Sequence, residues 1–118
     1  MSAPRILVIE DDGLQAMTLE DLLEDIGCEV AASFGAMTQA TAWLQAGGQA
    51  DAALLDVNVD GEPVYPFADL LVARRMPFCF TSGYGHVTER RFENALVLGK
   101  PLSRQMLLTA LRGFGLSV

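Results

Sequence analysis

The chain has 118 residues, 51% of them hydrophobic, which suits one compact domain with its own core and leaves no room for a second. Eight Lys and Arg against 15 Asp and Glu give a net charge of -7, which argues against binding to a phosphate backbone, so nucleic acid is not a predicted partner. The apolar stretches are too short to cross a membrane and residues 1–4 carry no signal-peptide core, so we expect a cytoplasmic protein without membrane insertion.

Short apolar runs alternate with amphipathic helical patterns along the chain. In chain order, the predicted elements are a strand at 6–9, a helix at 19–26 closed by Gly27, a weaker strand at 28–32, a helix at 36–46 closed by Gly47 and Gly48, a strand at 52–55, a helix at 67–75, strands at 78–81 and 95–98, and a helix at 106–111. Runs that are apolar at almost every position are typical of strands buried on both faces of a parallel sheet. The pattern predicts a three-layer α/β fold with right-handed crossovers.

The connection between the last two strands is unusually short. Only eleven residues, 84–94, separate Gly83 from the predicted fifth strand. This is too few for a usual crossover helix with both of its loops. We therefore expect the fourth helix to be short or missing, and the polar loop around His86 to be exposed.

Polar residues follow four of the strands at the point where each strand ends. Glu10 and Asp11 leave the first strand, Asp56 ends the third, and Ser82 and Lys100 follow the fourth and fifth. Because the ligand crevice of an open α/β sheet lies beyond the carboxyl ends of its strands, these five groups are expected to converge. Carboxylates forced together repel one another unless a cation lies among them, and a hard divalent ion such as Mg²⁺ suits oxygen ligands.

At these residues the chain resembles the receiver domain of two-component response regulators. The signals are the acid pair after strand one, the Asp after strand three, a hydroxyl after strand four and Lys-Pro after strand five. The stretches "DVNVDGEPVYPFADLL" and "PFCFTSGYG" are similar to alphaproteobacterial stand-alone receivers with a Phe-Ala-Thr-Gly type motif. The resemblance implies one receiver domain over residues 1–118 without an output domain, and a flavodoxin-like, doubly wound five-stranded parallel sheet in the order 2-1-3-4-5.

The resemblance also implies how the acidic residues act. Asp56 would accept a phosphoryl group from the phosphohistidine of a sensor histidine kinase or phosphotransfer protein. Glu10, Asp11 and Asp56 would hold Mg²⁺, and the backbone carbonyl of Asn58 would complete the protein ligands. Asp12 would be a neighbour and not a ligand, well placed to cap the first helix. The signal would pass to an unknown downstream protein, with the chain a monomer or weak dimer.

Lys100 and a hydroxyl complete the predicted site. Lys100 is the only lysine in the chain, and its ammonium suits a carboxylate or phosphoryl oxygen as a point charge. Counting from the flanking proline and glycine places Ser82 at the family's switch hydroxyl, with Thr81 as the alternative, because strand side chains alternate and Thr81 is expected to point into the sheet. Many receivers carry a switch aromatic where this chain has Val97, which leaves open whether Tyr84 or the whole loop takes that role.

Each of these residues has an ordinary structural reading when it is considered alone. A single Asp after a strand usually caps a turn, an acidic run can simply begin a helix, and a single Lys is usually a solvated surface charge. The two cysteines, Cys28 and Cys79, are predicted to be buried thiols and not a disulfide. A functional site is therefore predicted from the acidic and basic residues occurring together, and not from any one of them.

Two functions of different classes fit the sequence. The first is a phosphoacceptor receiver that signals through protein contacts or acts as a phosphate sink, and the second is a constitutive interaction module, a pseudo-receiver that does not use phosphorylation. An enzyme is not predicted. A Mg²⁺-dependent phosphatase using the Asp nucleophile ranks last, because its general acid would conventionally lie two residues after Asp56, where the chain has Asn58.

Overall fold

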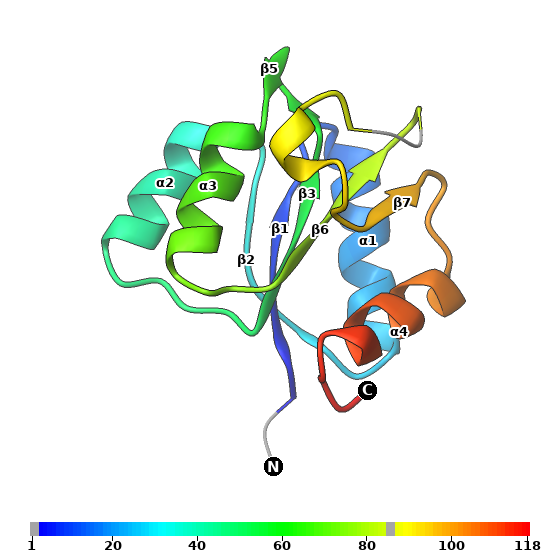
Figure 1. Ribbon diagram of the computed structural model, residues 1–118. Helices are drawn as coiled ribbons and strands as arrows, with labels where there is room; N and C mark the ends of the chain where they lie inside the picture. Colours follow the sequence, from blue (N-terminus) through cyan, green and yellow to red (C-terminus); the bar gives the residue numbers. More distant parts are fainter. Residues whose placement is uncertain (1–2, 85–86) are drawn as a thin grey trace.

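A five-stranded parallel sheet lies between two layers of helices in the computed structural model, which describes residues 3–84 and 87–118 (Figure 1). The strands are β1 (Arg5–Ile9), β2 (Glu29–Phe34), β3 (Ala52–Asp56), β6 (Phe78–Ser82) and β7 (Val97–Gly99), in the order β2-β1-β3-β6-β7. The helices are α1 (Gly13–Asp25), α2 (Met37–Gln45), α3 (Tyr65–Ala73) and α4 (Arg104–Gly113). Since β6 and β7 are the fourth and fifth strands of this sheet, the predicted order 2-1-3-4-5 is confirmed.

The alternation of side chains along the strands divides the core in two. On β1, Leu7 and Ile9 pack with the layer of α2 and α3, whereas Ile6 and Val8 pack with the layer of α1 and α4. Both faces of the sheet are thus covered, which explains why the strands are apolar at almost every position. No helix within the described residues is long and apolar enough to cross a membrane.

Both cysteines are buried free thiols, as predicted. Cys79 lies on β6 and Cys28 precedes β2, and both pack in the core beneath α1 and α4. Burial raises the pKa of Cys28, and it raises the pKa of Cys79 to about 12. Both side chains therefore act as small apolar core residues at neutral pH.

Helix α1 begins earlier than the predicted 19–26, because Asp12 caps it. The Asp12 Oδ1 atom accepts hydrogen bonds from the N–H groups of Leu14 and Gln15, each at 3.0 Å. These two donors would otherwise have no partner at the helix start. The helix ends as predicted before Gly27, which has a φ of +94°. The cap fixes the direction in which the chain leaves β1.

We expect Asp12→Ala to lower the free energy of unfolding by about 1 kcal/mol, because both capping hydrogen bonds are lost. Denaturant unfolding of the metal-free protein measures this. Asp21→Ala, at an exposed position inside the same helix, is the matched control and should change the free energy far less. Equal losses in the two variants would show that the cap contributes nothing specific.

The connection from β6 to β7 contains a single 3-10 turn, η1 (Arg90–Phe92), in its described residues 83–84 and 87–96. This agrees with the predicted short or missing fourth helix, while the expected exposure of His86 lies outside the described residues. Strand β7 is shorter than the predicted 95–98 and shifted toward Gly99. The sheet therefore ends in a three-residue edge strand.

A small hairpin between β3 and α3 was not predicted. Its strands are β4 (Asn58–Val59) and β5 (Glu62–Pro63), and its turn is Asp60-Gly61. Both turn residues have positive φ, +51° and +79°, as a two-residue hairpin turn built on Asp-Gly requires. In Figure 1 the hairpin stands above the carboxyl ends of the sheet strands, beside the predicted site.

Candidate functional site

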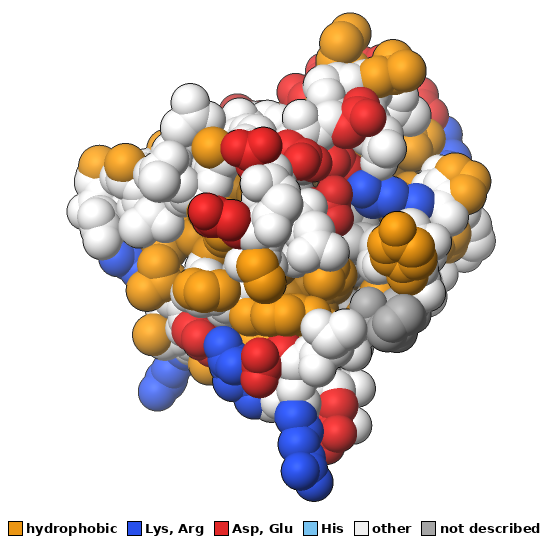
Figure 2. Space-filling model, turned by 90° about the horizontal axis from the view of Figure 1, so that it is seen from above, with side chains coloured by type: hydrophobic (Ala, Val, Ile, Leu, Met, Phe, Trp, Pro, Cys, Tyr) orange, Lys and Arg blue, Asp and Glu red, His pale blue; other side chains and the backbone are white. Residues whose placement is uncertain are grey.

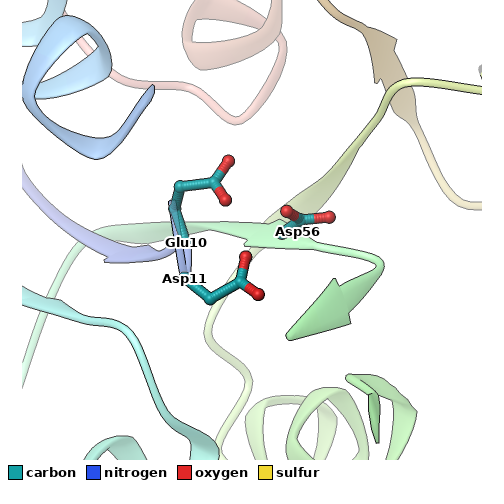
Figure 3. A group of neighbouring side chains, drawn as sticks. All are labelled: Glu10, Asp11 and Asp56. Atoms are coloured by element: carbon teal, nitrogen blue, oxygen red, sulfur yellow. The ribbon is translucent and has the colours of Figure 1, made fainter. Parts of the chain in front are cut away.

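Three carboxylates meet at the carboxyl edge of the sheet (Figure 3). Strands β1 and β3 are neighbours, and the pairing of Ile9 with Leu55 brings Glu10 and Asp11 level with Asp56. One carboxylate oxygen from each of the three lies within 4.8 Å of the others. Acidic side chains gather on the face of the molecule that includes this edge (Figure 2).

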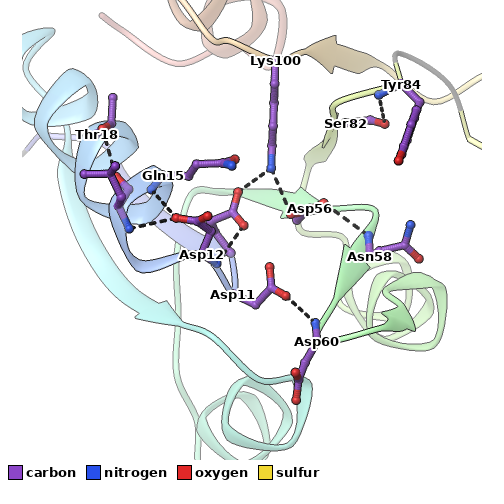
Figure 4. Close-up of polar contacts among 12 residues, drawn as sticks. Asp11, Asp12, Gln15, Thr18, Asp56, Asn58, Asp60, Ser82, Tyr84 and Lys100 are labelled. Atoms are coloured by element: carbon purple, nitrogen blue, oxygen red, sulfur yellow. Dashed lines mark hydrogen bonds and ion pairs between the residues drawn. The ribbon is translucent and has the colours of Figure 1, made fainter.

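Lys100 lies between two of these carboxylates (Figure 4). Its backbone N–H donates to the Ser82 carbonyl at 2.9 Å, which continues the β6–β7 ladder past the end of β7. Its Nζ donates to Glu10 Oε1 at 2.5 Å and to Asp56 Oδ2 at 3.0 Å. The side chains of Lys100, Glu10 and Asp56 are 20%, 4% and 14% exposed, so water screens these ion pairs weakly.

Burial and charge alter the proton affinity of two of these groups. The pKa of Glu10 rises from 4.5 to about 7, mainly because the side chain is buried. The hydrogen bond from Lys100 lowers this pKa, and the neighbouring Asp56 raises it. Burial alone would lower the pKa of Lys100, but its bonds to Glu10 and Asp56 outweigh this and leave it above its usual value. Lys100 therefore stays charged, while Glu10 holds its proton unusually tightly.

The remaining oxygens of the carboxylates accept backbone N–H groups. Asp12 N–H donates to Glu10 Oε2 at 3.2 Å, Asn58 N–H to Asp56 Oδ1 at 3.3 Å, and Asp60 N–H to Asp11 Oδ2 at 2.7 Å. These bonds hold each side chain in place at the sheet edge. The turn of the β4–β5 hairpin thus supports Asp11, a contact that the Asp-Gly dipeptide could have suggested but that the sequence analysis missed.

The chemistry of these donors fits a hard divalent cation. The three carboxylates outnumber the one ammonium among them, and all offer oxygen, the ligand type that Mg²⁺ prefers. Asn58, whose backbone carbonyl was predicted as a further ligand, lies exposed at the start of β4, two residues after Asp56. Asp12 lies outside the group of three and caps α1.

The two candidate hydroxyls lie at the end of β6. Ser82 is buried, and its Oγ accepts the Tyr84 N–H at 3.0 Å, which shapes the start of the following loop. Thr81 is also buried, pairs in register with Asp56, and lines a cavity of about 490 Å³ together with Glu10 and Lys100. Both residues thus lie at the end of β6, but of the two only Thr81 lines the cavity with Glu10 and Lys100, while the Ser82 hydroxyl is bonded to the Tyr84 N–H.

Glu10 should make the stability of the metal-free protein depend on pH. The folded protein holds this proton more tightly than the unfolded chain, so its contribution to stability is complete below pH 4.5 and is lost as the pH rises to about 7. We expect the free energy of unfolding to fall across this window by up to about 1.4 kcal/mol per pH unit relative to Glu10→Gln. Denaturant unfolding in EDTA measures both proteins, and identical pH profiles would contradict the raised pKa.

Comparison with known proteins gives the family. The sequence matches no protein-family model and no curated protein sequence. The structure of SdrG from Sphingomonas melonis Fr1 superposes with a TM-score of 0.84 and 37% identity, over 98% of this chain and 100% of SdrG. The BeF3-activated conformation of SdrG from Pseudomonas melonis Fr1 gives 0.76 and 38%, over 95% of this chain and 97% of that one.

A third structure shares the fold. The receiver domain of the PhyR response regulator from Erythrobacter litoralis gives a TM-score of 0.83 at 24% identity, over 97% of this chain and 91% of that domain. Because 37% of the residues are identical to those of SdrG over 98% of this chain, the protein belongs to the receiver domains of response regulators.

Proposed function

We propose that this chain is a phosphoacceptor receiver in two-component signal transduction. Asp56 accepts a phosphoryl group from the histidine of a sensor kinase or phosphotransfer protein, and the phosphorylated form signals through protein contacts or serves as a phosphate sink. The observation that carries the proposal is the grouping of Glu10, Asp11 and Asp56 within 4.8 Å, with Lys100 bonded to two of them. The proposal treats residues 1–118 as a single receiver domain that acts in the cytoplasm.

The chemistry asks little of the nucleophile. An oxygen of Asp56 forms a bond to phosphorus as the bond from phosphorus to the donor histidine nitrogen breaks, and the imidazole leaves. Such a transfer passes through a loose transition state, in which positioning and charge neutralisation provide most of the catalysis. Mg²⁺, when held by Glu10, Asp11, Asp56 and the Asn58 carbonyl, would supply positive charge near the phosphoryl oxygens.

Lys100 and Ser82 have distinct roles in this proposal. The Lys100 ammonium, already 3.0 Å from Asp56 Oδ2, remains charged and pairs with a phosphoryl oxygen. The Ser82 hydroxyl turns toward the phosphoryl group and gives up the bond that its Oγ accepts from Tyr84 N–H. Because that bond shapes the start of the loop after β6, its loss changes the loop. Thr81, on the preceding position, is the alternative hydroxyl.

The alternative is a constitutive interaction module that keeps the fold without using the acidic site. Incubation with acetyl phosphate, with Mg²⁺ or with EDTA, followed by intact-mass measurement, separates the two. The phosphoacceptor should gain one phosphoryl group in Mg²⁺ and far less in EDTA. A chain that gains none under either condition, while remaining folded, would favour the constitutive module.

A further inference from the structure

The short connection between β6 and β7 is fastened to helix α3. Tyr65, the first residue of α3, is buried, and its hydroxyl oxygen accepts the Thr88 N–H at 3.0 Å. The same hydroxyl lies 3.3 Å from Thr88 Oγ1 in a second hydrogen bond. Further along, Arg91 makes two hydrogen bonds to Asp69 of α3, at 3.0 and 2.8 Å. We call residues 87–92 the clasp.

The ring of Tyr65 also joins the clasp to strand β6. It stacks on Phe92 of η1 with ring centres 5.8 Å apart, and it meets Phe80 of β6 edge-on, also at 5.8 Å. Phe80 and Phe92 contact each other at 5.5 Å. Phe80 lies two residues before Ser82, so one buried aromatic side chain touches both the strand that carries the switch hydroxyl and the clasp.

The aromatic cluster of Tyr65, Phe80 and Phe92 lies beside the position on β7 where many receivers carry a switch aromatic. Val97 is the register partner of Phe80 on β7, and its small side chain packs at the margin of the same core. The aromatic contacts of Phe80 therefore come from α3, η1 and its own strand. Only Tyr65 among these rings adds a hydroxyl that bonds the clasp backbone.

The contacts of the clasp differ in strength. Arg91 and Asp69 are 47% and 48% exposed, and ion pairs so open to water contribute little. Tyr65 and Phe92 are buried, and although Thr88 is itself exposed, its N–H and Oγ1 bond to the hydroxyl of the buried Tyr65 side chain. The buried contacts thus decide whether the clasp stays on α3.

We propose that Tyr65 is the residue that positions the clasp and couples it to the end of β6, in place of an aromatic at position 97. A displacement of Ser82 shifts the end of β6 and the Phe80 ring, and the Tyr65 ring carries the shift to Thr88 through its hydroxyl. The surface formed by the clasp and α3 then changes when the acidic site is occupied. The coupling rests on the proposed phosphoacceptor function. The fastening of the clasp, meaning its hydrogen bonds to Tyr65 in the unphosphorylated protein, does not.

Amide exchange measured by NMR tests the fastening directly, because the Thr88 N–H itself donates to Tyr65. In the resting protein, Tyr65→Phe removes only the hydroxyl and should speed exchange at Thr88 by roughly two- to tenfold. Asp69→Asn, which removes the exposed ion pair, should change it less than about twofold. Unchanged Thr88 exchange in a folded Tyr65→Phe variant would overturn the fastening.

The coupling is tested with Mg²⁺ and beryllium fluoride as the probe of the occupied site. Wild type should show altered exchange across the clasp on binding, and Tyr65→Phe, saturated with the probe, should lose that alteration. If the change in clasp exchange were lost in Tyr84→Phe and kept in Tyr65→Phe, the coupling would belong to Tyr84, and the role proposed for Tyr65 would be overturned. Failure of wild type to bind the probe would overturn the proposed function and the coupling together, while the Thr88 comparison would still decide the fastening.

Discussion

Millimolar Mg²⁺ should raise the melting temperature of the wild-type protein, and Asp11→Asn should abolish the increase. Glu10, Asp11 and Asp56 place three acidic groups within 4.8 Å, so a cation that binds only the folded state relieves their repulsion. At a Mg²⁺ concentration about tenfold above Kd, the stabilisation is about 1.4 kcal/mol, or roughly 3–6 °C for a domain of this size. Thermal unfolding followed by circular dichroism measures it.

The controls separate metal binding from general salt effects. NaCl at matched ionic strength screens charges without occupying the site and should give a much smaller shift. Asp12→Asn changes an acidic residue that lies beside the three carboxylates and caps α1, so it should keep the full Mg²⁺ shift. The metal assignment would be wrong if Mg²⁺ and NaCl acted alike on wild type, or if Asp12→Asn lost the shift as Asp11→Asn does.

Lys100→Met should lower the free energy of unfolding of the metal-free protein by about 2–3 kcal/mol at pH 8. The substitution keeps the length of the side chain but leaves two largely buried carboxylates without their ammonium. Removing Lys100 also removes the hydrogen bond that lowers the pKa of Glu10, so that pKa rises further. Glu10 of the variant then takes up a proton as the pH falls toward 7, and the loss should shrink over that range. Mg²⁺ should restore more stability to this variant than to wild type.

Arg104→Met is the matched control for Lys100→Met. Arg104 pairs with Asp25 at 2.6 Å, but both side chains are exposed, and such a pair contributes less than about 1 kcal/mol. Denaturant unfolding of both variants across pH 5 to 9 makes the comparison. Equal and pH-independent losses in the two variants would mean that Lys100 is an ordinary surface charge.

The hydrophobic pattern of the sequence predicted the strands of this fold, because burial on both faces of the sheet constrains every strand residue. The segments 6–9, 52–55 and 78–81 had to be apolar at almost every position, and the residues that follow them had to meet at one edge of a parallel sheet. Glu10, Asp56 and Lys100 are therefore found together even though up to 90 positions separate them in the chain.

The features that the sequence did not predict depend on contacts between distant segments. Tyr65 and Thr88 are 23 residues apart, and neither a periodic pattern nor a motif marks them as partners. Asp60 contacts Asp11 only because the hairpin turn folds back over the sheet edge. The hydrophobic pattern predicted a start of α1 at residue 19 instead of Gly13. The apolar residues Leu14 and Met17 near the start of the helix are exposed, so they do not follow the apolar spacing of its second half.

The central claim is that Asp56 is the phosphoacceptor, and labelling of wild type and Asp56→Asn side by side tests it most directly. Both proteins are incubated with acetyl phosphate and Mg²⁺, and intact mass is measured before and after treatment with hydroxylamine, which cleaves acyl phosphates. We expect wild type to gain one phosphoryl group that hydroxylamine removes, and a folded Asp56→Asn variant to gain none. Equal labelling of the two proteins, or a label on wild type that resists hydroxylamine, would contradict the claim.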